Sequence, residues 1–260
     1  LETAVALDYT KLRRYKNPVQ KICILIEKEN MQYEEPHDFA YDIIIGFRQI
    51  AEPAGFEVEI IPIDIQTQRS QHYDNYVGAF VIGFSLNDPW IKDFETSRTP
   101  TVLFDNYIVG NPSTAYVGID NDEGMVLAVS YLIRLGHRKI AYLSSSLGSR
   151  VLQIRHASFF RAMHQHGIKT SSANAGCSYH LSECIEKHLP RFLKSGMTAI
   201  ICSQDTIASA AITQCQRLGY RVPNDMSIVG FDDLPLAAHL SPPLTTIRQD
   251  RSELGKSGFF

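Results

Sequence analysis

Short apolar runs separated by amphipathic stretches recur along most of this chain. Strands of a parallel sheet are covered on both faces, so they read as continuous apolar runs, and we expect six runs here to be buried strands. The six runs are Ile22–Ile26, Ala79–Gly83, Thr101–Phe104, Lys139–Leu143, Thr198–Cys202 and Ser227–Phe231.

The stretches between the runs carry helical periodicity and helix end signals. Asp38 can cap one helix and Asn121 a second, with Gly136 as the left-handed residue that ends the second helix. A third helix is expected over Thr206–Leu218, ending before Gly219. Regular alternation of strand and helix predicts an α/β fold with doubly wound parallel sheets and right-handed crossovers.

Polar residues follow the predicted strands at the ends where α/β proteins bind ligands. Hydroxyl, amide and carboxylate groups of this kind can bond several neutral hydroxyls at once, which favours a sugar; a phosphorylated ligand would need more cations. Arg155 is the principal cation expected to join them, since its guanidinium can fork across two acceptors. The polar residues are Glu27, Ser85, Asp105 with Asn106, Ser144 to Ser146, Gln204 with Asp205, and Asp232 with Asp233.

Each of these residues also has an ordinary structural interpretation. Asp205 and Asp232 can simply cap the segments that follow them, because Asp is common at strand-to-helix turns. Phe39 can be a core residue, and Ser144 to Ser146 can be only a loop. Both interpretations stay open at this point.

Composition and motifs exclude several classes of protein. The chain has 260 residues, 44% hydrophobic and 20% charged, with a net charge of -3, so no overall basic field attracts nucleic acid. No apolar run is long enough for a membrane span and no signal peptide is evident, so we expect a cytoplasmic protein with five reduced cysteines.

Motifs for catalysis and cofactors are not matched either. Gly255-Lys256-Ser257 lacks the glycine of a phosphate loop, since Asp250 stands at that position, and no GxGxxG follows the first strand. His164 and His166 are two residues apart and would face different sides of a helix. We expect no cofactor and no metal. A hydrolase stays open only because Ser, His and Asp can meet in space without a sequence signal.

Three blocks carry a resemblance to a known family. Residues 118–144, 198–233 and 241–258, the last beginning SPPLTTIRQD, resemble the effector-binding core of LacI/GalR-type transcriptional regulators. The resemblance implies two lobes, similar to type I periplasmic sugar-binding proteins, with an effector held between them and a homodimer formed side by side.

The resemblance also implies a division of the chain. Residues 1–18 would be a remnant of the DNA-binding head and linker, residues 19–119 plus 249–260 the N-terminal lobe, and residues 120–248 the C-terminal lobe. The start LETAVALDY is similar to the last helix of the head, and Phe260 precedes the final strand and helix that family members add. We therefore expect a fragment whose helix-turn-helix, the part that reads operator DNA, is missing.

Ligand-binding roles follow from the resemblance at individual positions. Asp105 matches an Asp that contacts sugar hydroxyls in family members, and Asp232 matches the acidic residue of the family's VGFDD block. Arg155 matches the arginine that begins the family's R-x-x-G-[FW] segment, with Ser158 in place of the glycine. Gln204 stands where many members have Asn. Gln249 falls at the crossover between lobes, and Phe39 lies where an aromatic ring can stack on a sugar.

The function implied is a sugar-responsive regulator, not an enzyme. Its effector is expected to be a neutral mono- or disaccharide, and its other partners are operator DNA and a second copy of the chain. The alternative is a transport-associated sugar-binding protein on the same architecture. The absence of an export signal, the unpaired cysteines and the start LETAVALDY weigh against that alternative.

Overall fold

The computed structural model describes residues 19–27, 39–63, 75–83, 98–104, 113–145 and 147–260. The predicted head remnant at 1–18 and the predicted cap Asp38 lie outside these ranges. The strands are β1 (Gln20–Glu27), β2 (Phe56–Ile63), β3 (Gly78–Ile82), β4 (Thr101–Phe104), β5 (Thr114–Val117), β6 (Ile140–Ser144), β7 (Ala175–Cys177), β8 (Ala199–Cys202), β9 (Ser227–Asp232) and β10 (Thr245–Arg248). The helices are α2 (Phe39–Ala51), α4 (Asn121–Arg134), α5 (Arg150–Gln165), α6 (Leu181–Glu183), α7 (Leu189–Lys194), α8 (Asp205–Arg217), α9 (Leu236–His239) and α10 (Arg251–Ser257), with short 3-10 and π turns at Ser172–Asn174 and Cys184–His188.

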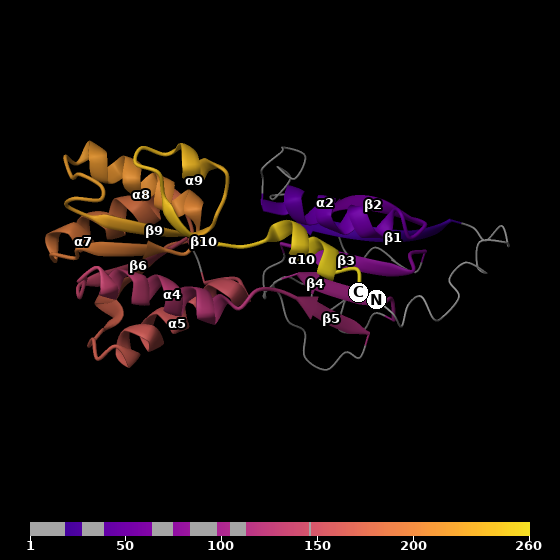
Figure 1. Cartoon of the computed structure of the whole chain (residues 1–260), viewed down its shortest axis with the longest axis horizontal. Helices are drawn as coiled ribbons and strands as arrows, with labels where there is room; N and C mark the ends of the chain where they lie inside the picture. The colour runs from indigo at the N-terminus through magenta and orange to yellow at the C-terminus, as the bar shows by residue number, and fades with distance from the viewer. Residues whose placement is uncertain (1–18, 28–38, 64–74, 84–97, 105–112, 146) are drawn as a thin grey trace.

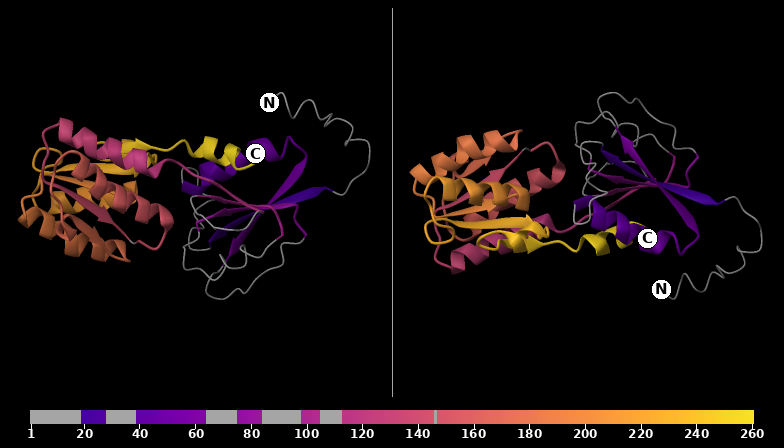
Figure 2. Two further views of the ribbon diagram at one scale, coloured as in Figure 1. Left: turned by 90° about the horizontal axis from the view of Figure 1, so that it is seen from below. Right: turned by 90° about the horizontal axis from the view of Figure 1, so that it is seen from above.

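The strands form two separate five-stranded sheets, and every recorded strand pair is parallel. The first sheet has the order β2-β1-β3-β4-β5 and the second the order β10-β9-β8-β6-β7. We call the first sheet with α2 and α10 the first lobe, and the second sheet with α4 to α9 the second lobe. They lie side by side along the long axis of the molecule (Figures 1 and 2). The predicted fold class is confirmed.

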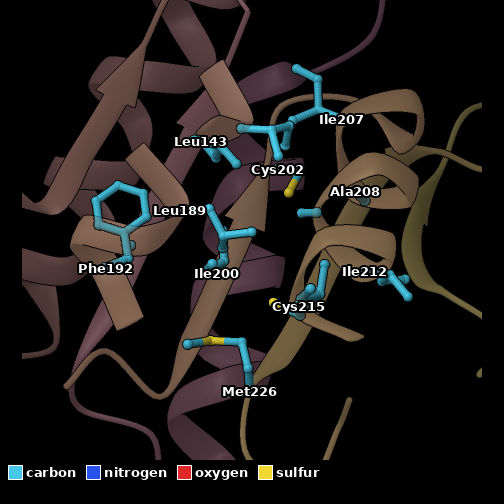
Figure 3. Packing of buried hydrophobic residues seen from close by; sticks show 14 of the residues in the cluster. Leu143, Leu189, Phe192, Ile200, Cys202, Ile207, Ala208, Ile212, Cys215 and Met226 are labelled. Atoms are coloured by element: carbon cyan, nitrogen blue, oxygen red, sulfur yellow. The ribbon is translucent and has the colours of Figure 1, made fainter. Parts of the chain in front are cut away.

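Alternation along the strands gives each sheet two covered faces. In β6, Ala141 and Leu143 pack under α7 and α8, whereas Ile140 and Tyr142 pack under α4 and α5. Figure 3 shows the first of these clusters, in which Cys202 and Cys215 fill space among aliphatic side chains. All five cysteines are free, and four of them are buried.

The last helix packs closely on the first one described. Helices α2 and α10 lie side by side in the first lobe although they are far apart in sequence (Figure 1). Two glycines allow the approach: a Cβ on Gly46 would lie 2.1 Å from the Ser252 carbonyl oxygen, and a Cβ on Gly255 would lie 2.0 Å from the Ile43 carbonyl oxygen. The chain therefore crosses back from the second lobe to the first after β10, and the packing of α10 on α2 holds it in the first lobe.

The two crossovers determine which ends of the sheets face each other. One leaves the carboxyl end of β5 and enters α4, and the other leaves the carboxyl end of β10 and enters α10. Because all strands within a sheet are parallel, the carboxyl ends of each sheet face the other lobe. That is the edge at which α/β proteins place ligands.

Helix ends match the predictions in part. Gly136 and Gly219 have φ of 94° and 83°, so both are left-handed residues that follow helices, as expected. The predicted cap Asn121 is wrong. Asp120 is the cap of α4, and its carboxylate accepts a hydrogen bond from the Glu123 amide, while Asn121 is the first helical residue and turns inward.

The α2–α10 contact gives a stability prediction. Gly46→Ala should lower the free energy of unfolding by roughly 1 to 3 kcal/mol, because the new methyl group overpacks the Ser252 backbone and outweighs the better helix propensity of alanine. Gly78→Ala is the control, since its Cβ would make an ordinary 3.5 Å contact with Pro100. Urea unfolding of both variants measures the difference; equal stability of Gly46→Ala and the unsubstituted protein would contradict the tight contact.

Candidate functional site

Four predicted residues lie at the carboxyl edge of the second sheet. Ser144 ends β6, Gln204 follows Ser203 after β8, Asp232 ends β9 and Gln249 follows β10. These strands are neighbours in the sheet order, so their ends gather on the side facing the first lobe.

Arg155 connects this edge to the first crossover. Its side chain rises from α5, is 2% exposed, and donates through Nε to Asn121 Oδ1 at 2.7 Å. Its Nη1 donates to the Ser203 carbonyl at 2.6 Å and to Asp232 Oδ1 at 3.2 Å. The guanidinium carbon also lies 3.6 Å from the centre of the Phe231 ring, a cation–π contact. One buried cation thus has partners from three elements of the second lobe.

Asp232 is buried together with this cation. Its side chain also accepts a hydrogen bond from Nε2 of Gln249, a residue of the second crossover. Burial raises the pKa of the Asp232 carboxyl to about 7, and the nearby Arg155 charge opposes that shift. The raised pKa means that the fold keeps a carboxyl group where its ionisation is costly, as is common at functional sites.

The backbone that carries Asp232 has an unusual conformation. Asp232 and Asp233 have φ of 111° and 53°, in a region that residues with a side chain rarely adopt. Arg251 Nη1 donates to both of their carbonyl oxygens, at 2.6 and 3.3 Å. The positive φ values let the chain turn at the end of β9 while the Asp232 carboxyl points at Arg155.

One buried polar atom at this edge has no hydrogen-bond partner within the described part of the chain. It is Gln249 Oε1, whereas the buried Tyr142 hydroxyl interacts with the Ser144 and Ser203 side chains. Buried polar groups are nearly always satisfied in folded proteins, so an unpartnered oxygen beside a buried Arg–Asp pair marks a place for a polar ligand or water.

Comparisons with known proteins agree with the sequence resemblance. A family model described as a periplasmic binding protein-like domain matches residues 129–258. The chain is 33% identical over 231 residues to the HTH-type transcriptional repressor PurR of Aliivibrio salmonicida (strain LFI1238), a match that covers 84% of this chain and 68% of that repressor. Another repressor of that name, from Vibrio vulnificus (strain CMCP6), is matched over 43% of its length.

Solved structures of regulators have the same fold. A regulatory protein of LacI family from Chloroflexus aggregans has a TM-score of 0.77 and 26% identity, covering 91% of this chain and 88% of that one. A complex of the transcriptional regulator CelR with cellobiose has a TM-score of 0.81 over 99% of this chain and 81% of that one, at 22% identity. The chain belongs to the LacI/GalR-type family of transcriptional regulators.

Not every residue predicted for the effector site of this LacI/GalR-type core lies with Arg155. Ser144 is fully buried at the end of β6, and Gln204 is half-buried before α8. Phe39 opens α2 in the first lobe, half-buried, with its ring 6.1 Å from that of Phe104. Ser85 and Asp105 lie outside the described residues.

Asp205 has a structural role, but it does not cap the segment that follows it, because Gln204 is the N-cap residue of α8 and Asp205 is its first helical residue. It is fully buried and accepts hydrogen bonds from the Leu234 amide at 2.8 Å and from Thr246 Oγ1 at 2.6 Å. These bonds hold the turn after β9 against β10, so both carboxylate oxygens of Asp205 are used in intramolecular hydrogen bonds. A Cβ on Gly230 would lie 2.1 Å from its Oδ1, which shows how tightly that turn encloses it.

Sequence reasoning missed four residues that complete the site. Asn121 and Ser203 accept hydrogen bonds from Arg155. Arg251 bonds Asp42 of α2 and the turn formed by Asp232 and Asp233 at the end of β9, which we call the Asp232 turn. Asn121 carried a signal, a polar residue directly after a crossover, but we interpreted it as a cap. Arg251 and Asp42 are 209 positions apart and carry no local signal of pairing.

The hydrolase alternative gains no support from the Ser178–His188 contact. His188 Nε2 lies 3.0 Å from Ser178 Oγ, but Arg191 Nη2 lies 3.5 Å from the other ring nitrogen. A guanidinium therefore lies where a Ser-His-Asp triad has its carboxylate, so the described residues around His188 do not form that arrangement. Among the described residues, no group of His, Cys, Asp and Glu is placed to hold a metal ion.

Two surface hollows of the second lobe lie at the other end of the sheet. One, of about 490 Å³, is lined by Gln216, Tyr220, Arg221 and Pro242, among others. The second, of about 220 Å³, includes Ser227 and Thr245, the first residues of β9 and β10. They border the amino ends of the strands and lack a buried charge, so we place the candidate site by its chemistry at the carboxyl edge.

The Asp232 pKa makes a pH prediction. Between the ordinary value of 3.8 and about 7, the folded protein holds a proton that the unfolded chain has released, so stability should fall as pH rises through this range. Asp232→Asn should remove this pH dependence. The unsubstituted protein should therefore lose on the order of 2 kcal/mol more unfolding free energy between pH 5 and pH 8 than the variant does.

The control is Asp233→Asn, which alters the adjacent, more exposed carboxylate. Urea unfolding at both pH values gives the differences. Any constant cost of leaving Arg155 without its partner cancels between the two pH values. Parallel pH profiles for Asp232→Asn and the unsubstituted protein would contradict the raised pKa.

Proposed function

We propose that this chain is the effector-binding and dimerisation core of a sugar-responsive LacI-type regulator. The observation that carries the proposal is the buried group of Arg155, Asp232 and Gln249 at the carboxyl edge of the second sheet. This group lies between the two crossovers and on the side that faces the first lobe, where a ligand can touch both lobes.

The charges favour a neutral, hydroxylated ligand. Within the described residues of the site, Arg155 is paired with Asp232 and Arg251 is paired with Asp42. A phosphate would have to compete with these carboxylates for its cations, whereas sugar hydroxyls can donate to a carboxylate and accept from a guanidinium at once. Gln249 Oε1, which is buried and has no hydrogen-bond partner among the described residues, offers a further polar contact.

The remaining site residues complete the proposal. Ser144 and Gln204 belong to the second-lobe side of the ligand, and Phe39, Ser85 and Asp105 to the first-lobe side. In the division we propose, residues 19–119 plus 249–260 form the N-terminal lobe and residues 120–248 the C-terminal lobe. A neighbour of the same fold, the transcriptional regulator CelR, was solved in complex with cellobiose, so this fold can hold a saccharide of two rings.

The proposed mechanism is ligand-linked closure of the lobes. A sugar that bonds groups on both lobes favours the closed arrangement by its differential affinity for that arrangement. A side-by-side homodimer passes the bias to helix-turn-helix heads that bind operator DNA in the cytoplasm, and a coupling of about 1 to 3 kcal/mol suffices. None of the described helices is long and apolar enough to cross a membrane. The transport alternative is less well supported, because the matched relatives are named as transcriptional repressors.

Thermal unfolding against a ligand panel tests this function. The panel contains neutral mono- and disaccharides, sugar phosphates, and purine bases and nucleosides. A ligand at 100 times its dissociation constant adds about 2.7 kcal/mol of stability, so we expect a clear rise in Tm with a neutral saccharide. A rise only with phosphorylated sugars or purines would overturn the assigned ligand class.

Calorimetric titration of the saccharide so found then tests the residues. Arg155→Ala and Asp232→Ala should each weaken binding at least about tenfold, because each leaves a buried polar partner unsatisfied. Arg150→Ala is the matched control, an exposed arginine at the start of the same helix α5. Unchanged affinity in both site variants would defeat the assignment.

A further inference from the structure

Arg251 joins two parts of the molecule that otherwise belong to different lobes. It is the first residue of α10, just after the second crossover, and is 8% exposed. Its Nε and Nη2 donate to the same oxygen, Asp42 Oδ2, at 3.0 and 2.9 Å. Its Nη1 donates across the junction to the carbonyl oxygens of Asp232 and Asp233.

The guanidinium suits this double attachment. Its donors lie in one rigid plane, so a rotation that improves one set of bonds worsens the other. The Asp42 side chain lies in the first turn of α2, and its hydrogen bonds within the described residues both come from Arg251. A shift of the first turn of α2 would therefore move Arg251 and, with it, its hydrogen bonds to the carbonyl oxygens at the end of β9.

The far end of this connection is the strained turn of the candidate site. Positive φ at two successive aspartates persists only where surrounding contacts hold it. Arg251 holds the two carbonyl oxygens, while Thr246 Oγ1 and Asp205 Oδ2 accept from the amides of Asp233 and Leu234. The same turn aims the Asp232 carboxyl at Arg155 and Gln249.

We propose that Arg251 is a positioning residue that couples the first turn of α2 in the first lobe to the Asp232 turn in the second. Any displacement of the lobes then alters the bonds that keep Asp232 in its positive-φ conformation. The use of this link in effector sensing rests on the proposed function, whereas the link itself requires no ligand.

Hydrogen–deuterium exchange of the whole chain, without ligand, tests the link. Asp42→Ala removes the first-lobe end of the link while leaving every second-lobe residue unchanged. We expect exchange at the amides of residues 233–234 to become roughly 2- to 30-fold faster, which is the range of 0.5 to 2 kcal/mol found for residues that carry coupling between sites. Arg251→Lys should give a similar increase, because a single ammonium group cannot reproduce the planar guanidinium's bonds to Asp42 and to the two carbonyl oxygens at once.

Two controls separate coupling from general loss of stability. Exchange in β8, at the centre of the second sheet, should stay unchanged in both variants. Arg248→Ala removes a nearby but exposed arginine, 3.9 Å from Asp233, and should leave the turn as it is. Unchanged exchange at 233–234 in Asp42→Ala, or an equal increase in β8, would overturn the proposal. Because no ligand is used, this result is independent of which effector the panel identifies.

Discussion

The buried contact between Arg155 and Asp232 is the interaction on which the junction of the two lobes depends. A buried guanidinium and its carboxyl partner can be kept out of water only where their contact is supplemented by further hydrogen bonds. Those bonds come from Asn121, the Ser203 carbonyl and Gln249. Asn121 follows the first crossover and Gln249 lies on the second, so satisfying one ion pair fixes where both connecting segments enter the second lobe.

Whether a strand could be predicted from the sequence depends on whether it lies inside its sheet or at an edge. The six predicted runs correspond to β1, β3, β4, β6, β8 and β9, the interior strands of the two sheets. The four that were missed, β2, β5, β7 and β10, are the four edge strands. Interior strands are covered by helices and by neighbours, so they read as apolar runs; edge strands such as β5 and β10 contain exposed positions and lack that signature.

The candidate site divides in a similar way between local and long-range information. Arg155 and Asp232 could be named from sequence because a carboxylate after an apolar run and an arginine in a family-type segment are local patterns. Their pairing with each other, and the bond from Arg251 to Asp42, join residues 77 and 209 positions apart. The raised pKa of Asp232 likewise depends on burial beneath the assembled edge, which appears only when the strands are in register.

Under the proposed function, the arrangement also limits how an effector can act. A ligand that touched only Arg155 and Asp232, which both belong to the second lobe, would bind open and closed lobes equally well, and equal affinity shifts no equilibrium. An effective ligand must therefore gain contacts with the first lobe on closure, or change an existing connection between the lobes. Arg251 is such a connection, since its bonds to Asp42 and to the Asp232 turn cannot both persist if α2 and β9 move apart. A ligand that reorients Asp232 directly changes the turn that Arg251 holds. Its different affinities for the two lobe arrangements can then come from the Arg251 bonds as well as from the ligand's own contacts.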